Sequence, residues 1–386
     1  MTFLDINIMH KNLFLLFLII TSFSFSQNSK LTSSSKVSIL TCGTGNESYS
    51  LYGHTGIRIK DISSGIDIVY NYGAFDFQTP NFMLKFVKGD LQYFVTTNQY
   101  ADFEYGYRYE NRSIYEQELG LTLEQKQLLY QQLNGSLFSE DRYYTYKFID
   151  RNCTTMVIDK INSILGSKII TTKKPVTISY REILFPYVEN HYFQKLGINI
   201  IFGNKVDNAA ETLFLPLELH RTLKESKVDL KPLVTKETTV YEAKIVPYQS
   251  SVLNSAYIVI SILVLIVLAN NKHITSTYLT IAGLMGVFLT LVGLYSFHEE
   301  VLWNYNVFLF NPLLLLFVFT LYKRNTQWII NVGKINLVCL VAYLLFLLNK
   351  VDLMLLLPFI AAHFIMITRI IMKCKSKNKV ENTIVL

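Results

Sequence analysis

The sequence lacks the motifs that most cofactor-dependent and nucleic-acid-binding proteins carry. Its 386 residues contain no glycine-rich phosphate loop, no zinc-type spacing of cysteine and histidine, and no nucleic-acid-binding motif. The formal net charge of +7 would suit a nucleic-acid ligand, but a hydrophobic fraction of 51% and an aromatic fraction of 14% favour a membrane protein. We therefore expect no metal, no cofactor and no nucleic-acid partner, and we assign the basic residues to loops and a tail on the cytoplasmic side.

Cysteine is also scarce, and the sequence contains only Cys42, Cys153, Cys339 and Cys374. Only Cys42 and Cys153 precede the long apolar runs, so only these two would lie outside the cytoplasm. In an oxidising compartment they could form a disulfide, which is the main structural interpretation of both residues. The alternative is that Cys153 is a free and reactive thiol.

The N-terminus has the pattern of a secretory signal. Lys11 precedes an apolar run, and a small-x-small cleavage site ends at Ser26. We expect residues 1–26 to be a signal peptide, with an uncleaved anchor as the alternative. The exported domain would then occupy residues 27–250.

Five long apolar segments follow the exported domain. Each is about long enough to cross roughly 30 Å of hydrocarbon as a helix. The segments are residues 252–270, 277–297, 306–322, 328–348 and 352–372. We therefore expect an all-α membrane domain of five transmembrane helices over residues 251–374.

The basic residues around these segments indicate their orientation. They gather on one side, in two loops and in the tail at residues 375–386, whereas the opposite side holds His298, Glu299 and Glu300. The positive-inside rule puts the exported domain outside and the basic tail in the cytoplasm. We expect the three residues from His298 to Glu300 to form a solvated loop rather than a metal site.

The exported domain alternates strand-like runs with turns. In residues 54–59 polar and apolar residues alternate, so that odd-numbered residues face one side of a strand and even-numbered residues the other. A turn at residues 61–65 leads into a second strand over residues 66–72. These runs predict a half-buried antiparallel sheet.

Two helix starts are marked by capping residues. Thr122 and Gln125 fit a capping box. Asn152 is a favourable N-cap, and apolar residues follow it at helical spacing, so that Cys153 would occupy the first turn of a helix. The positive end of the helix dipole would stabilise a thiolate there.

His54, on its strand, supplies the second group of a candidate site. A nearby imidazole lowers the pKa of a thiol and shuttles its proton, which makes Cys153 and His54 a candidate nucleophile and base. A histidine strand before a cysteine helix reverses the order of papain. It resembles the circularly permuted NlpC-type and lecithin:retinol-acyltransferase-type enzymes.

That resemblance implies an α+β papain-like exported domain in permuted order. It also implies a thioester on the cysteine and a third polar residue that orients the imidazole. On the strand that follows the histidine strand, Asp67 and Asn71 share one alternating face. Both stay open as the third residue.

A closer resemblance covers residues 36–372. The motifs that carry it are LTCGTGNESYSLYGHTGIR at residues 40–58, YNYGAFDF at residues 70–77, YENR at residues 109–112 and DRNCTT at residues 150–155. They resemble the signature of the Lnb family of lipoprotein N-acyltransferases. That family joins a periplasmic domain to a multi-span membrane region, which is the order expected here.

The resemblance implies an acyltransferase of the bacterial inner membrane with its catalytic domain in the periplasm. An acyl chain would pass from a membrane phospholipid, through a thioester on Cys153, to the α-amino group of a diacylated lipoprotein, with His54 as the base. Because Cys42 lies in the same motif as His54, a nucleophilic Cys42 stays open.

Two other functions fit the same residues. A membrane-anchored cysteine peptidase or amidase acting on cell-wall peptides would use the same pair. Five spans favour a lipid substrate over this alternative, because a single span would anchor a peptidase. A non-enzymatic envelope protein would instead hold Cys42 bonded to Cys153.

Overall fold

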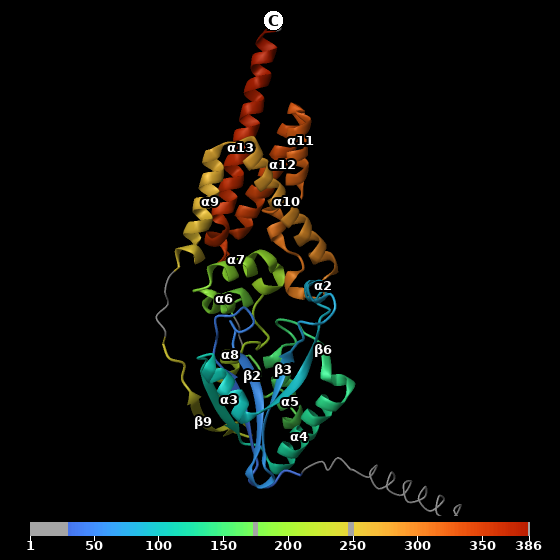
Figure 1. The fold of residues 1–386 in the computed structure, drawn as a ribbon, viewed down its shortest axis with the longest axis vertical. Helices are drawn as coiled ribbons and strands as arrows, with labels where there is room; N and C mark the ends of the chain where they lie inside the picture. Colours follow the sequence, from blue (N-terminus) through green and yellow to red (C-terminus); the bar gives the residue numbers. More distant parts are fainter. Residues whose placement is uncertain (1–29, 173–176, 246–250, 385–386) are drawn as a thin grey trace, which may run out of the picture.

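The protein consists of a sheet domain and a helical bundle stacked along its longest axis (Figure 1). The structure, a computed structural model, describes residues 30–172, 177–245 and 251–384. The chain forms the sheet domain first and the bundle second. The expected signal peptide, residues 1–26, lies outside the described residues.

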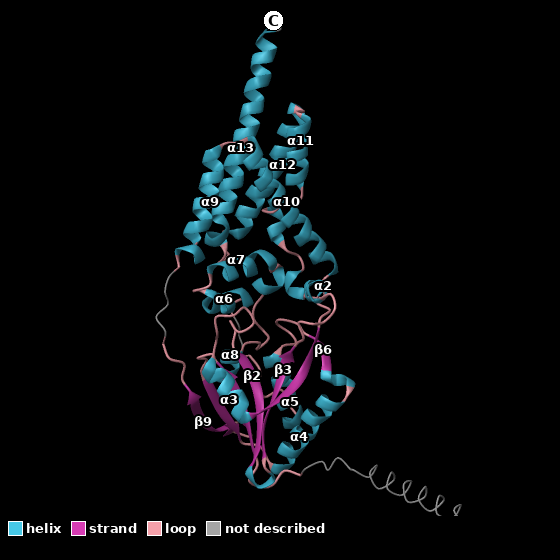
Figure 2. Cartoon of the chain, viewed as in Figure 1, coloured by secondary structure: helices cyan, strands magenta, loops and turns pink. Residues whose placement is uncertain are grey.

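Within the described residues, a seven-stranded antiparallel sheet forms the centre of the first domain (Figure 2). Its strands run in the order β6-β4-β3-β2-β1-β5-β9. They are β1 (Lys36–Cys42), β2 (His54–Asp61), β3 (Ile66–Ala74), β4 (Gln92–Gln99), β5 (Ile114–Leu119), β6 (Tyr143–Thr145) and β9 (Val234–Tyr241), with β7 (Lys227–Val228) and β8 (Lys231–Pro232) paired separately. The predicted antiparallel sheet is confirmed.

Helices cover both faces of this sheet. One face packs against α4 (Leu123–Phe138), α5 (Cys153–Leu165) and α8 (Pro216–Glu225) in the main hydrophobic core. The opposite face packs against α3 (Tyr100–Tyr109) over a smaller core. Each large apolar side chain that becomes fully buried stabilises the fold by about 1.5–3 kcal/mol.

The alternation predicted for residues 54–59 is confirmed. Ile57 and Ile59 are fully buried in the main core. Arg58 points to the other face, where its guanidinium lies 3.1 Å from the ring centroid of Tyr100 on α3. The strand therefore presents its even-numbered residues, His54 among them, on the side of α3.

The helix α4 begins as predicted. The hydroxyl of Thr122 accepts a hydrogen bond from the amide of Gln125 at 3.2 Å, and the side chain of Gln125 accepts one from the amide of Thr122 at 2.9 Å. An N-cap of this kind stabilises a helix by about 1 kcal/mol. The capping box is therefore confirmed.

Short elements join the sheet domain to the bundle. They include α6 (Tyr180–Leu184), η3 (Phe185–Val188), α7 (Tyr192–Ile201) and η4 (Asn204–Asp207), while η1 (Ile62–Ser64), α2 (Phe82–Lys88) and η2 (Glu140–Arg142) lie between strands. In the joining layer, buried Arg181 forms an ion pair with Asp207 at 2.7 Å and lies 3.8 Å from Asp352 before the last helix. One buried cation thus links carboxylates of both domains.

The second domain is a bundle of apolar helices. Its elements are η5 (Val252–Asn254), α9 (Ala256–Ala269), α10 (Lys272–Tyr295), η6 (Glu299–Val301), η7 (Tyr305–Phe308), α11 (Leu313–Lys323), α12 (Thr326–Leu347) and α13 (Leu353–Ile384). In the described part of the chain, four segments are long and apolar enough to span a membrane, namely Lys272–Tyr295, Glu299–Lys323, Thr326–Leu347 and Leu353–Ser376. The apolar helix α9 is shorter, so the structure supports about four spanning helices where the sequence predicts five.

Two boundaries differ from the expected ones. The third span, expected over residues 306–322, consists of η6, η7 and α11, because Pro312 lacks an amide proton and the regular helix starts only after it. The last helix, α13, continues to Ile384. The tail expected over residues 375–386 is therefore helical as far as the structure describes it.

Candidate functional site

Asn152 fixes the start of α5, as the sequence predicts. Its side-chain oxygen accepts hydrogen bonds from the amides of Thr154 and Thr155 at 2.8 and 3.0 Å. The amide of Met156 donates to the carbonyl of Asn152. The side chain of Asn152 therefore does not bond to the amide of Cys153, which is also in the first turn of the helix. This amide and the helix N-terminus both favour negative charge beside Cys153.

The thiol of Cys153 contacts the imidazole of His54, the first residue of β2. The residues that follow each of them also meet, because the hydroxyls of Thr55 and Thr154 lie 3.2 Å apart. Burial by itself raises the pKa of the Cys153 thiol, but the hydrogen bond and charge of His54 outweigh it and hold that pKa below its usual 9.0. The imidazole therefore makes the Cys153 thiol more acidic than burial alone would leave it.

Asn71 on β3 holds the other side of the imidazole. Its Oδ1 lies 3.0 Å from Nε2 of His54, and its Nδ2 donates to Oδ1 of Asn98 at 2.9 Å. Because the amide nitrogen of Asn71 serves Asn98, its oxygen is the acceptor and Nε2 of His54 carries the proton. Nδ1 of His54 is then the nitrogen that can accept the proton of the Cys153 thiol.

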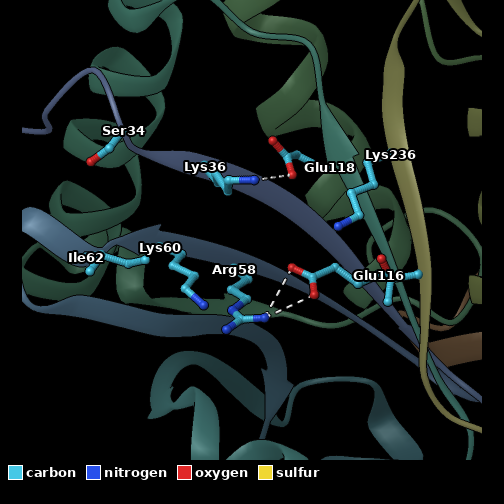
Figure 3. A pocket seen from close by; sticks show the side chains of 9 residues that line it. Ser34, Lys36, Arg58, Lys60, Ile62, Glu116, Glu118 and Lys236 are labelled. Atoms are coloured by element: carbon cyan, nitrogen blue, oxygen red, sulfur yellow. Dashed lines mark hydrogen bonds and ion pairs between the residues drawn. The ribbon is translucent and has the colours of Figure 1, made fainter.

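Asp67, the other candidate for a third residue, lies elsewhere. Its two carboxylate oxygens pair with the guanidinium of Arg58, both at 2.7 Å. Arg58 also pairs with Glu116 at 3.0 Å and lines a surface hollow of about 300 Å³ that includes neither Cys153 nor His54 (Figure 3). The structure therefore brings Asn71, and not Asp67, to the imidazole.

Two glycines that the sequence analysis did not single out make room at the site. Gly56 lies opposite Asn71 in the register of β2 and β3, and a Cβ on it would lie 3.3 Å from Oδ1 of Asn71. Gly73 has a φ of +97°, which favours glycine, and a Cβ on it would lie 3.9 Å from the Cβ of Cys153. A side chain at position 56 would press on Asn71, and position 73 needs the backbone conformation that glycine favours.

Cys42 is a buried neighbour of the site. Cys42 and Cys153 are both free thiols, so the disulfide considered as an alternative is not formed. The side chain of Cys42 is fully buried in the small core beneath α3. Burial raises the pKa of its thiol far above the ordinary value, although Arg112 acts in the opposite direction. A shielded, neutral thiol is a poor nucleophile, which argues against Cys42 in that role.

The loop between α10 and α11 is not the solvated loop that the sequence predicts. Glu300 is buried, and its Oε1 accepts a hydrogen bond from the amide of Ile149 at 2.9 Å. Glu299 forms ion pairs with Lys147 at 2.7 Å and with Lys205 at 2.8 Å. The expectation was wrong because Glu300 and Glu299 have partners on the segment that leads into α5, and Glu299 has a second partner, Lys205, on η4. The bundle thereby contacts the segment that leads into α5 and Cys153.

The assembled groups have a definite chemistry. A thiolate beside an imidazole can attack an ester or amide carbonyl and hold the acyl group as a thioester. The first-turn amide of Cys153 is positioned as a donor for the oxyanion that forms during such an attack. In residues 30–172, 177–245 and 251–376, whose side chains the structure describes, no group of three or more potential metal ligands occurs.

Comparisons with known proteins identify both parts of the chain. Residues 24–184 match the Lnb N-terminal periplasmic domain, and residues 241–380 match the Lnb transmembrane domain. Together the two matches cover more than half of the chain. No curated protein and no solved structure matches it. The papain-like fold in permuted order therefore stays a prediction.

Proposed function

The chain belongs to the Lnb family, in which a periplasmic domain is joined to a membrane domain, and from this premise we propose that it is a lipoprotein N-acyltransferase. It transfers an acyl chain from a membrane phospholipid to the α-amino group of a diacylated lipoprotein. The observation that carries this proposal is the contact of the Cys153 thiol with an imidazole that Asn71 holds from its other side.

In the first half-reaction, His54 takes the proton of the Cys153 thiol, and the sulfur attacks the ester carbonyl of the phospholipid. A carbon–sulfur bond forms, the carbon–oxygen bond breaks, and His54 returns the proton to the leaving alkoxide. The products are a thioester on Cys153 and a lysophospholipid. The amide of Cys153 donates to the oxyanion, and one such donor is worth roughly 10²-fold or more in rate.

In the second half-reaction, the α-amino group of the lipoprotein attacks the thioester carbonyl. A carbon–nitrogen bond forms, the carbon–sulfur bond breaks, and the proton of the amine passes through His54 to the sulfur of Cys153. An ester and an amine have then become an amide and an alcohol, and the enzyme is regenerated. The path is ping-pong, because the lysophospholipid leaves before the amine reacts.

The membrane domain supports this class of substrate. The loop that follows the spanning helix α10 bonds to the segment before α5, so the site is close to the end of the bundle. Phospholipids and lipoproteins both reside in the membrane, and holding both there supplies proximity. The basic residues at the opposite end of the helices support a location in the bacterial inner membrane, with the catalytic domain in the periplasm.

Reconstitution of the full chain in vesicles tests the proposal. The vesicles contain phospholipid with isotopically labelled acyl chains and a synthetic diacylated lipopeptide with a free α-amino group. We expect the lipopeptide to gain one labelled acyl chain as an amide, with an equal amount of lysophospholipid. A lipopeptide with an acetylated amine is the matched control and should gain none.

Two variants test whether the product depends on the proposed nucleophile and base. Cys153→Ala and His54→Ala should each lose the product while still inserting into the vesicles. Full activity of the Cys153→Ala protein would overturn the mechanism. Cleavage of cell-wall peptides that depends on Cys153, with the lipopeptide unchanged, would instead support a membrane-anchored cysteine peptidase or amidase.

A further inference from the structure

The short helix α2 lies close to the lower end of the bundle (Figure 1), and large apolar side chains on and beside it are exposed. Phe77, Met83 and Leu84 are 71%, 65% and 72% exposed, and Phe86 is 45% exposed. We call these four residues the α2 patch. Contiguous exposed apolar side chains mark an interaction surface, because a water-facing domain gains nothing from exposing them.

The last turn of α2 is bonded to the end of α10, a spanning helix. The side chain of Ser296 and the amide of Phe297 donate to the carbonyls of Val87 and Lys88 at 3.0 and 2.7 Å. The ring of His298 donates to the carbonyl of Phe86 at 2.9 Å. The bonds from Ser296 and Phe297 satisfy the carbonyls of Val87 and Lys88, which have no partner within the helix end. They hold the α2 patch beside the end of α10.

A row of aromatic rings leads inward from the α2 patch. In order, the row comprises Phe86, Phe82, Phe75, Tyr93 and Tyr146. Successive ring centroids lie 6.2, 5.9, 5.2 and 4.5 Å apart. These separations are those of aromatic rings in contact, so the row is continuous from the surface of α2 into the sheet domain.

The inner end of the row lies beside the nucleophile. A Cβ on Gly73 would lie 3.6 Å from Cε2 of Tyr146 and 3.9 Å from the Cβ of Cys153. Tyr146 and Cys153 therefore flank the bare backbone of Gly73, with no side chain from that position between them. An acyl chain lying along the row would bring its carbonyl to the thiol.

We propose that the α2 patch and the aromatic row form the route by which an acyl chain of a phospholipid in the adjacent leaflet reaches Cys153. The route rests on the proposed function and names the lipid-binding face of that site. The occupant is a phospholipid because the patch is continuous with a spanning helix. In addition, α2 carries Lys85, whose charge suits a phosphate headgroup, whereas Lys88 is paired with Asp90 at 2.8 Å. Apolar side chains of such an interfacial helix enter the acyl region of a bilayer.

Photo-crosslinking tests the route without any chemistry at the thiol. A benzophenone amino acid replaces Leu84 in full-length Cys153→Ala protein in vesicles of phosphatidylethanolamine and phosphatidylglycerol. The matched control carries it at Ile62, which is 78% exposed but follows the far end of β2 from His54. We expect phospholipid adducts at position 84 at about ten times the yield at position 62 or more. Equal yields would overturn the route.

A charge substitution separates the route from the proposed function. Leu84→Glu should slow acyl transfer from vesicle phospholipid by about ten-fold or more, because a carboxylate resists entering the acyl region. It should leave the alkylation of Cys153 by iodoacetamide unchanged, and Ile62→Glu should change neither rate.

The outcomes of the two experiments are distinct. Normal acyl transfer by the Leu84→Glu protein would overturn the route and leave the proposed function standing. No acyl transfer by the unsubstituted protein would overturn the proposed function, and the route to Cys153 with it. The crosslink at position 84 would still report contact of the α2 patch with lipid.

Discussion

Nε2 of His54 lies 3.0 Å from Oδ1 of Asn71 on the neighbouring strand, and the Cys153 thiol contacts the same imidazole. Asn71 is itself held by Asn98 at 2.9 Å. This chain of contacts fixes both the orientation of the ring and the nitrogen that carries its proton. Replacing each of these contacting residues should therefore have its own measurable effect.

Replacing Asn71 by alanine should slow acyl transfer. Without the acceptor, the ring can rotate and the tautomer with Nδ1 toward the thiol is no longer favoured, so we expect kcat/KM to fall on the order of 10-fold or more. The matched control is Asp67→Asn, because Asp67 lies on the same strand face and contacts Arg58 instead. It should keep nearly full activity.

The pH profile of both variants distinguishes positioning from mere destabilisation. The Asn71→Ala protein should show its acid limb at higher pH than the unsubstituted protein, since the imidazole supports the thiolate less well. The profile of Asp67→Asn should be unchanged. A loss of activity in Asp67→Asn together with full activity in Asn71→Ala would contradict the arrangement.

Alkylation of Cys153 should report its thiolate directly. Only the thiolate reacts, so the rate rises with pH, and half of the maximal rate is expected below pH 9.0 because His54 holds the pKa of the thiol under that value. In the His54→Ala protein only the hydrogen bonds of Thr55 and Thr154 still oppose burial, so the midpoint should move to higher pH. Timed iodoacetamide treatment with peptide mass spectrometry measures both. Identical midpoints would show that the imidazole has no influence on the thiol.

Cys42→Ala should retain acyl transfer. The thiol of Cys42 is fully buried, and burial raises its pKa, so it stays neutral and shielded. Its removal leaves a small cavity that costs on the order of 1 kcal/mol of stability. In the unsubstituted protein Cys42 should be alkylated only after denaturation. Rapid labelling of Cys42 in the folded protein would contradict this assignment.

Glu300→Ala should destabilise the junction of the two domains far more than Glu299→Gln. Loss of the Glu300 carboxylate leaves the buried amide of Ile149 without its acceptor, which costs about 1–3 kcal/mol. The side chain of Glu299 is 46% exposed, and ion pairs of this kind are worth about 1 kcal/mol or less. Thermal unfolding of the solubilised variants is the measurement. A larger loss in Glu299→Gln would reverse this order.

Much of the local structure could be predicted from the sequence. Strand alternation assigns His54 and Thr55 to opposite faces, and the cap residue Asn152 assigns Cys153 to the first turn of α5. These predictions hold because each depends only on neighbours along the chain.

To identify the third residue, which orients the imidazole, the register between β2 and β3 is needed. Asp67 and Asn71 share a face, so alternation alone cannot separate them. The short turn after β2 pairs Asp61 with Ile66, and counting back from it puts Asn71 opposite Gly56. The same count puts Asp67 opposite Lys60, far from His54 along the strand. That turn was the signal in the sequence that could have identified Asn71.

The contacts between the two domains could not be predicted from any local pattern in the sequence. The carboxylates of Glu299 and Glu300 meet partners near residue 149, and the last turn of α2 meets the end of α10. Local patterns report only that these residues are polar or apolar. Their burial depends on how the sheet domain docks on the bundle, which no periodicity encodes.

The acyl-enzyme is the most direct test of the central claim. The purified protein is incubated with phospholipid in the absence of any amine acceptor, digested, and analysed by peptide mass spectrometry with and without neutral hydroxylamine. We predict one acyl chain on the peptide that contains Cys153, removed by hydroxylamine as a thioester must be, and none on the peptide that contains Cys42. An unmodified Cys153, or an acyl chain on Cys42 instead, would contradict the account.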